Sequence, residues 1–275
     1  MTGNIDDYPE GIIIPIDKPY RWTSADVIRK VKYQAIRHFS KKNLKVGHAG
    51  TLDPLATGVL LVCIGKATKL AEELQKHEKQ YLAGVTFGAT TPSYDLEKEI
   101  DRMYPSDGVS EEALKAVLPT FIGPQEQIAP LFSAKSVDGV RAYEMARKLY
   151  RTSQREGSDF DHSYAELLSK QNIIISEMQL VSFEDRSVVD KVSANEKSGR
   201  IHVADVSGLE LPKAQILVTC SKGTYIRALA RDLGEALDSG AFLHSLRRTR
   251  NGGFRVEDSL TVDEVLEILG HQISL

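Results

Sequence analysis

Residues 45–70, KVGHAGTLDPLATGVLLVCIGKATKL, constrain the fold and the chemistry of this chain more than any other stretch. The stretch begins with small and polar residues, carries one carboxylate at Asp53, and continues into the apolar run 59–64. Glycines let a backbone approach a ligand closely, and a short, apolar, β-branched run predicts a buried strand. A single acid on a stiff loop before a buried strand is a candidate for chemistry, and the alternative is an ordinary surface turn capped by Asp53.

Composition limits the class of protein. The 275 residues allow one large or two modest domains, and contents of 41% hydrophobic and 27% charged residues are typical of globular proteins. No apolar run is long enough to span a bilayer, and the acidic N-terminus lacks the apolar segment of a secretory signal. Cys63 and Cys220 lie in separate apolar runs, which favours reduced thiols, and no Cys/His group has metal-ligand spacing. We therefore expect a cytoplasmic protein that is not bound to a membrane and has no metal site.

The charges are segregated along the chain, although the net charge is only −3. No acid lies between Asp26 and Asp53, which we name the first basic window, or between Asp238 and Glu257, the second basic window. Acid-free basic windows are typical of a polyanion site, but two solvated surfaces would produce the same pattern. The first window holds Arg29, Lys30, Lys32, Arg37, Lys41, Lys42 and Lys45, and the second holds Arg247, Arg248, Arg250 and Arg255.

The hydrophobic patterns predict an α+β fold with a mixed, mainly antiparallel sheet flanked by helices. Helices are predicted from Thr23 or Ser24 to about residue 36, from Ser110 to about 121, over 223–238 and after a capping box at Thr261. Strands are predicted over 11–16, 59–64, 81–87, 173–183, 201–206 and 216–220, with Pro15 placing the first at an edge or a bulge. We interpret the chain as a single domain over 1–275 with a polar insertion over about 150–208, to which we assign no role.

Missing motifs exclude three classes of site. Residues 65–68 lack the upstream glycine and the Ser or Thr of a phosphate-binding P-loop, and no G-x-S-x-G nucleophile elbow of a hydrolase is present. A glycosidase needs two carboxylates, and Asp53 has no partner acid in the neighbouring motifs. A single carboxylate held ionised by an arginine suits a nucleophile at a sugar carbon or a pyrimidine ring. The candidate partners of Asp53 are Arg227 and Tyr81.

Residues 45–70 resemble the signature of the TruB family of tRNA pseudouridine synthases, and five other motifs agree in the same order. IDKPYRWTS (16–24) is similar to the family's Lys-Pro motif, and KQY (79–81) to its tyrosine strand. APLFSAKSVDGVRAYEMAR (129–147) is similar to its RNA-gripping thumb, and CSKGTYIRALARDLGEAL (220–237) to its arginine helix. LRRTRNGGF (246–254) is similar to its C-terminal catalytic motif, so the resemblance covers nearly the whole chain.

This resemblance implies a pseudouridine synthase fold and the isomerisation of a uridine in the tRNA T-loop, at tRNA position 55, after base flipping. Asp53 would be the catalytic aspartate, Tyr81 would stack on the base and take part in proton removal, and Arg227 would keep Asp53 charged. The implied uridine-binding residues are His48, Tyr225, Leu246, Lys18 and Pro19. The implied RNA-binding residues are Lys135, Arg141, Arg147, Arg247 and Arg248.

The same resemblance implies a monomer that needs no cofactor, because the reaction breaks and remakes bonds within one nucleotide. Its partner would be the T-arm of tRNA, gripped by a thumb over about 127–150. Only about twenty residues follow Phe254, so we expect none of the C-terminal RNA-binding PUA domain of many relatives. Two alternatives stay open: a non-catalytic RNA-binding or tRNA-folding module, and a base-excising N-glycosylase that would release uracil.

Overall fold

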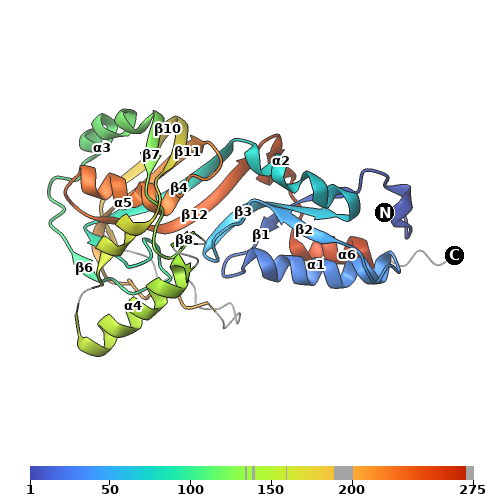
Figure 1. Ribbon diagram of the computed structural model, residues 1–275. Coiled ribbons are helices and arrows are strands. Elements are labelled where there is room, and N and C mark those ends of the chain that lie inside the picture. Colours follow the sequence, from blue (N-terminus) through green and yellow to red (C-terminus); the bar gives the residue numbers. More distant parts are fainter. Residues whose placement is uncertain (134, 138–139, 159, 189–200, 271–275) are drawn as a thin grey trace. The chain divides into compact units, whose positions relative to one another are not determined.

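The computed structural model divides the chain into two compact units (Figure 1). The first unit comprises Met1–Tyr81 and Arg247–Leu275, and the second comprises Leu82–Leu246. The boundary between the units falls within strands β4 (Lys79–Phe87) and β12 (Ala241–Asn251), so each of these strands belongs partly to the first unit and partly to the second. The single domain expected over 1–275 therefore stays a prediction. The structure describes residues 1–133, 135–137, 140–158, 160–188 and 201–270.

The sheet of the first unit is built around β3 (Ala56–Ile64), whose residues 59–64 are fully buried, as the apolar run predicts. Strand β3 pairs antiparallel with β1 (Ile12–Lys18) and β2 (Val46–Ala49) and also borders β12. Strand β1 lies at the end of the strand order, which confirms the edge position predicted from Pro15. The short strand β13 (Phe254–Arg255) pairs with the end of β12.

Two helices contact each other in the first unit, α1 (Ser24–His38) and α6 (Val262–Gly270). Helix α1 begins at the N-cap Thr23, which forms a capping box with Asp26, and it buries Val27, Val31 and Ala35, which recur at helical spacing. The remaining helical turns of this unit are η1 (Ile5–Asp7), η2 (Gly65–Leu70), α2 (Ala71–Lys76) and η5 (Val256–Asp258).

The second unit contains the long antiparallel pair β10 (Gln171–Val188) and β11 (Glu210–Cys220) in the strand order β12-β4-β11-β10-β7, where β7 is Gly123–Gln127.

The strand predicted over 201–206 is wrong, because these residues have no regular structure. Ala204 and Val206 are buried and the residues before each are not, so the alternation is real. Alternating burial shows which side chains face the interior, but a strand also requires a ladder of hydrogen bonds to a neighbouring strand. In this segment Ala204 N donates a single backbone hydrogen bond to Leu96 O, at 2.8 Å.

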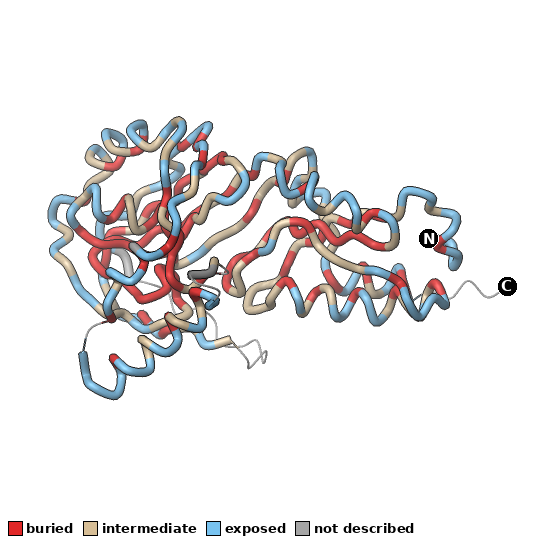
Figure 2. The backbone as a smooth tube through the Cα atoms, in the orientation of Figure 1, coloured by how far each residue is buried: buried red, intermediate tan, exposed pale blue. Residues whose placement is uncertain are grey.

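Helix α5 (Ile226–Ala236) begins after Tyr225 and buries Ile226, Leu229 and Leu233, the stripe that its helical spacing predicts. Burial follows the strands of each unit and one face of the longer helices (Figure 2). No helix among the described residues is long and apolar enough to cross a membrane. The other elements of the second unit are β5 (Ala89–Thr90), β6 (Arg102–Met103), α3 (Glu111–Val117), η3 (Leu118–Phe121), β8 (Ser136–Val137), β9 (Val140–Arg141), α4 (Ala142–Glu156) and η4 (His162–Leu167).

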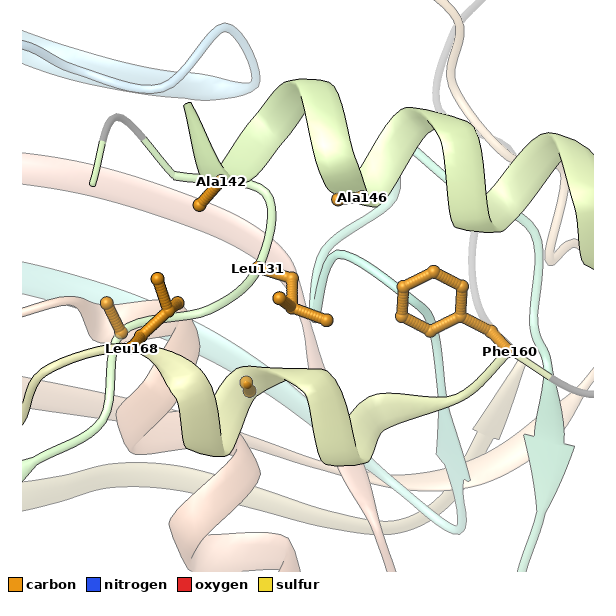
Figure 3. Close-up of a cluster of buried hydrophobic side chains, with 7 residues drawn as sticks. Leu131, Ala142, Ala146, Phe160 and Leu168 are labelled. Atoms are coloured by element: carbon orange, nitrogen blue, oxygen red, sulfur yellow. The ribbon is translucent and has the colours of Figure 1, made fainter. Parts of the chain in front are cut away.

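The segment predicted as a thumb has an apolar core of its own. Leu131 packs with Ala142 and Ala146 of α4, and with Phe160 and Leu168, which flank η4 (Figure 3). Phe160 and Leu168 belong to the polar insertion that the sequence left without a role. At least this part of the insertion is structural, because it covers the apolar face of α4.

Candidate active site

Asp53 lies on the loop between β2 and β3, and its side chain is half-buried. The carbonyl oxygen of every residue from 50 to 54 accepts a hydrogen bond. The carbonyl of Asp53 itself closes a turn by accepting from Ala56 N at 3.1 Å. Three buried side chains, Lys18, Ser24 and Arg248, donate four of these five bonds, so the backbone that carries the carboxylate is held from several directions. Such fixed geometry is what a reacting group requires.

Two of these donors belong to the Lys-Pro motif and the start of α1. Lys18 Nζ, buried beneath the loop, donates to Pro54 O at 3.2 Å and to Trp22 O at 2.5 Å. The hydroxyl of Ser24 donates to Leu52 O at 3.2 Å and accepts from Leu52 N at 3.0 Å. These bonds fix the backbone immediately before and after Asp53.

A second bond from Lys18 Nζ, at 3.1 Å, goes to the carbonyl of Pro19, the other residue predicted from this motif. Lys18 thus fixes the backbone of the loop, and Pro19 accepts a bond from the same ammonium. This agrees with a supporting role beneath a pocket, although contact of either with uridine stays a prediction.

Arg248 holds the other end of the loop. Arg248 is only 1% exposed. Its guanidinium donates to Gly50 O at 2.8 Å and to Val59 O at 2.7 Å. Its Nη1 also lies 3.5 Å from Thr51 O and 3.5 Å from the hydroxyl of Tyr81. Burial on backbone carbonyls argues against the predicted role of Arg248 in binding RNA. We interpret it as a positioning residue that connects the loop with Tyr81.

Gly58 makes this close approach of β3 and β12 possible. Its φ is +99°, and a Cβ at this position would lie 2.1 Å from the carbonyl oxygen of Arg248. The amide of Gly58 donates to Asp17 Oδ1 at 3.1 Å, and Asp17 also pairs with Arg247, with Nη2 2.7 Å from Oδ2. Arg247, predicted to bind RNA, therefore already carries a carboxylate partner.

The charges around the loop are coupled. Burial lowers the pKa of Lys18 to about 7, the nearby Asp53 carboxylate opposes this shift, and Arg248 adds to it. Burial and the same arginine lower the pKa of His48, which lies on β2, so its imidazole is neutral near pH 7. The Nδ1 atom of His48 is buried and has no hydrogen-bond partner among the described residues.

In the second unit, Arg227 lies in the first turn of α5 and is only 4% exposed. Its guanidinium donates to Ser93 O at 3.1 Å and to Phe132 O at 2.9 Å. Its Nε also lies 3.6 Å from Oδ2 of the buried Asp95. Asp95 in turn accepts from the Ser93 hydroxyl at 2.6 Å. The guanidinium is therefore fixed in orientation and partly neutralised within its own unit.

Sequence reasoning identifies neither Asp95 nor Ser93, because it predicts no element and no site in the segment directly after β4. The available signal was the concentration of hydroxyls and one acid directly after a predicted strand, Thr90 to Asp95. It also missed Gln127, whose side-chain amide accepts from Tyr225 N at 2.9 Å and donates to Tyr225 O at 3.2 Å. These two bonds fix the backbone of a predicted uridine-binding residue.

The other predicted residues lie as follows. Leu246 is half-buried on β12, and Lys135 accepts a backbone bond from Ala142 N at 2.8 Å. Arg141 lies on β9, immediately before α4, and Arg147 on α4 stacks over Tyr143 at 5.2 Å. Lys135, Arg141 and Arg147 thus all belong to the thumb segment.

The site residues fall into two groups by unit. The structure brings Lys18, Asp53, Tyr81 and Arg248 together in the first unit, and Tyr225 and Arg227 in the second. The predicted pairing of Asp53 with Arg227 joins residues of different units and stays a prediction. No cluster of metal-ligating side chains occurs in the part of the chain that the structure describes.

Two family profiles match the chain in its sequence order. The first is described as "TruB family pseudouridylate synthase (N terminal domain)" and matches residues 37–193. The second is described as "tRNA pseudouridylate synthase B C-terminal domain" and matches residues 227–272.

Similar proteins of several bacteria bear the name tRNA pseudouridine synthase B. The protein of Phocaeicola vulgatus is 46% identical over 266 residues, which cover 97% of this chain and 96% of that one. The protein of Bacteroides fragilis is 43% identical, with 97% of each chain covered. The protein of Clostridium kluyveri is 34% identical over 91% of this chain and 71% of that one.

Solved structures agree in fold. A chain in the crystal structure of a Cbf5-Nop10-Gar1 complex matches with a TM-score of 0.61 and 23% identity. A chain in the archaeal box H/ACA sRNP Nop10-Cbf5 complex matches with a TM-score of 0.57 and 21% identity. Each match covers 96% of this chain and 56% of the chain in the solved structure. The predicted pseudouridine synthase fold is confirmed.

Proposed function

The chain belongs to the TruB family of pseudouridylate synthases and is an isomerase, and we propose that it converts a uridine in the T-loop of tRNA to pseudouridine. The observation that carries this proposal is the fixed loop around Asp53. Lys18, Ser24 and Arg248 hold its backbone, and the charge of Asp53 acts on the buried ammonium of Lys18. A surface turn capped by Asp53 would need none of these buried donors.

The reaction exchanges one bond for another within a single nucleotide. The bond between N1 of the base and C1′ of the ribose breaks, the base turns, and a bond between C5 and C1′ forms. C5 loses one proton and N1 gains one, so the composition and the mass do not change. The Asp53 carboxylate supplies the negative oxygen that attacks the nucleoside or stabilises the detached sugar as an ion pair.

The proposed roles of the other site residues follow from this chemistry. Tyr81 stacks on the base and takes part in removing the C5 proton, and Arg227 pairs with Asp53 and keeps it ionised. His48, neutral through burial, occupies the space that the base leaves in the RNA stack. Tyr225 and Leu246 line the uridine pocket. Their side chains supply the apolar and aromatic surface that a flipped pyrimidine needs.

The base must leave the RNA stack before Asp53 can reach it. Flipping costs on the order of a few kcal/mol, and stacking on an aromatic ring such as Tyr81 can offset about 1–3 kcal/mol of that cost. The thumb residues Lys135, Arg141 and Arg147 contact the T-arm, and the ring of Tyr143 beneath Arg147 orients its guanidinium toward RNA. The proposal includes a monomeric enzyme that acts in the cytoplasm.

The experiment that tests the function is pseudouridine mapping on an unmodified tRNA transcript incubated with the protein alone. Wild type is expected to convert the T-loop uridine at tRNA position 55. Asp53→Asn is expected to abolish conversion while the tRNA Kd changes less than about threefold, since an amide nitrogen replaces one carboxylate oxygen and removes the charge with almost no change of volume. Conversion by the Asp53→Asn variant would exclude Asp53 as the nucleophile.

The same incubation separates the alternatives. An N-glycosylase would release free uracil and leave an abasic, lighter tRNA, whereas isomerisation leaves the mass unchanged. A binding module without catalysis would retain tRNA and produce neither product.

A further inference from the structure

The structure distinguishes the two basic windows. In the second window, Arg248 is bonded to backbone carbonyls and the other three arginines have carboxylate partners within the same unit. The partner distances are 2.7 Å for Arg247–Asp17, 2.8 Å for Arg250–Glu78 and 3.6 Å for Arg255–Glu257. This window therefore has little unpaired charge to offer to a polyanion.

The first basic window differs. Arg29 pairs with Asp26 at 2.8 Å and Lys41 with Asp6 at 3.5 Å. The remaining lysines of this window form no ion pair among the described residues. They are Lys30, Lys32, Lys42 and Lys45.

Most of these lysines line two adjoining hollows of the first unit, with volumes of about 430 and 510 Å³. The hollows share Asn43, Leu44, Lys45 and Thr68, and we name them together the lysine groove. Six exposed lysines line the groove, two of them from outside the first window, and Asp6 is its one carboxylate. The six are Lys32, Lys41, Lys42, Lys45, Lys66 and Lys69.

The walls of the groove have a fixed backbone. Gly65 N donates to Lys45 O at 2.8 Å, which joins the segment before β2 to the start of η2. The Thr68 hydroxyl donates to Gly65 O at 2.8 Å within η2, and Leu44 is only 4% exposed. The lysines therefore project from a backbone that is held in place.

The charge balance favours an anionic partner for this surface over solvation alone. Six ammonium groups and one carboxylate gather on one surface of a chain whose net charge is −3. Like charges in proximity repel one another, and a bound anion relieves this repulsion. Charges spread over two hollows suit an extended polyanion better than a single small anion. Flexible ammonium groups bind phosphates as point charges, without reading sequence.

We propose that the lysine groove binds backbone phosphates of the RNA substrate, outside the nucleotide that reacts. This inference rests on the proposed function, because that function supplies the RNA. Strand β2 connects the two places: Val46 and Gly47 line the groove, and the loop that carries Asp53 follows the other end of the strand. Its four residues span roughly 10 Å, so an RNA of more than a few nucleotides reaches both.

The test is a triple variant, Lys45→Gln, Lys66→Gln and Lys69→Gln, with the unmodified tRNA transcript as the probe. We expect the Kd to rise about tenfold at 0.1 M salt, and the slope of log K against log salt to decrease by about 2, because up to three phosphate contacts are lost. KM is expected to rise in parallel, while kcat at saturating tRNA stays within about twofold.

The matched control replaces Lys76, Lys115 and Lys170 with Gln, which changes the net charge equally. These lysines are also exposed, with side chains 58%, 61% and 59% accessible, but they lie outside the groove and each already pairs with a glutamate. We expect the control to bind tRNA within about twofold of wild type. An equal loss of affinity in the control would overturn the proposal, because the effect would then be one of net charge alone.

Asp6→Asn provides a test of opposite sign. Its side chain is 80% exposed and pairs with Lys41, so its removal should free that lysine and lower the Kd about twofold. An unchanged salt slope in the lysine variant, or weaker binding by Asp6→Asn, would overturn the proposal. If wild type binds tRNA without forming pseudouridine, the proposed function fails, whereas these binding measurements still decide on the groove.

Discussion

Arg248 donates a 2.8 Å hydrogen bond to the carbonyl oxygen of Gly50, which lies three residues before Asp53. The same guanidinium bonds Val59 on the far side of the loop and lies 3.5 Å from the Tyr81 hydroxyl. One buried side chain therefore holds both ends of the loop and contacts a second proposed catalytic residue. The planar guanidinium has several donors in fixed directions, which suits it to this task.

Replacing Arg248 should impair catalysis more than tRNA binding. Arg248→Met removes the donors that this side chain supplies to the carbonyls of Gly50 and Val59, and we expect a loss of about 2–4 kcal/mol of stability. A displaced loop should reduce kcat about 100-fold, with KM for tRNA changed less than threefold. Arg248→Lys keeps the charge but cannot span the same carbonyls, so it should also lose at least about tenfold in kcat.

The control for this prediction is Arg250→Met, two residues along the same strand. Arg250 pairs with Glu78 at a partly exposed position, so its loss should cost less than about 1 kcal/mol and leave kcat unchanged. Steady-state kinetics and urea unfolding measure both effects. A kcat of wild-type size in Arg248→Lys would refute the positioning role.

Lys18 should make the stability depend on pH above neutrality. Its pKa is about 7 in the folded protein, against about 10.4 in an unfolded chain. Between these values the unfolded chain binds more protons, so the free energy of unfolding rises with pH, by at most about 1.4 kcal/mol per pH unit. Below pH 7 the lysine is charged in both states, and its contribution to the slope disappears.

Lys18→Met removes this linkage. The difference in unfolding free energy between wild type and Lys18→Met should be constant below about pH 7 and shift in favour of wild type from pH 7 to 10. Urea unfolding at intervals of one pH unit measures it, and the other titrating groups cancel in the difference. Parallel curves for the two proteins over the whole range would mean that Lys18 titrates normally.

Gly58→Ala should destabilise the first unit. The new Cβ would lie 2.1 Å from the carbonyl oxygen of Arg248, on backbone that cannot give way locally, and φ at Gly58 is +99°. We expect a loss of at least about 2–3 kcal/mol, measured by urea unfolding. Gly253→Ala is the matched control, because no atom lies within 4 Å of its Cβ position. Equal stability of the two variants would contradict the close approach of β3 and β12.

Phe160→Ala should loosen the thumb helix. Phe160 is 5% exposed and packs with Leu131, Ala142 and Ala146, so truncation should cost about 3–5 kcal/mol of local packing (Figure 3). Hydrogen exchange of the α4 amides should become faster, and KM for tRNA should rise. Leu167→Ala on η4 is the control, since this leucine is 58% exposed. Unchanged exchange in Phe160→Ala would show that α4 does not depend on this core.

Local structure around the site followed largely from the sequence. The apolar run 59–64 became the buried centre of β3, the spacing in α1 and α5 gave the observed buried faces, and Pro15 marked an edge strand. These features depend on residues within a few positions of one another, so the amino-acid sequence alone is enough to predict them. The strand predicted over 201–206 failed because a strand also requires a partner, which local spacing does not reveal.

By itself, the sequence determined the loop that carries Asp53, the elements on either side of it, and the family that these motifs resemble. Only the tertiary structure decided which partners the basic residues have and how far they are buried. Arg248 is buried and bonds to carbonyls 189 and 198 residues away, and Arg247 is paired with a carboxylate 230 residues away. Lys42 and Lys45 form no ion pair within the part of the chain that the structure describes. The reason is that the electrostatic role of a side chain depends on burial and on partners brought close by folding, and neither is encoded in its neighbours along the chain.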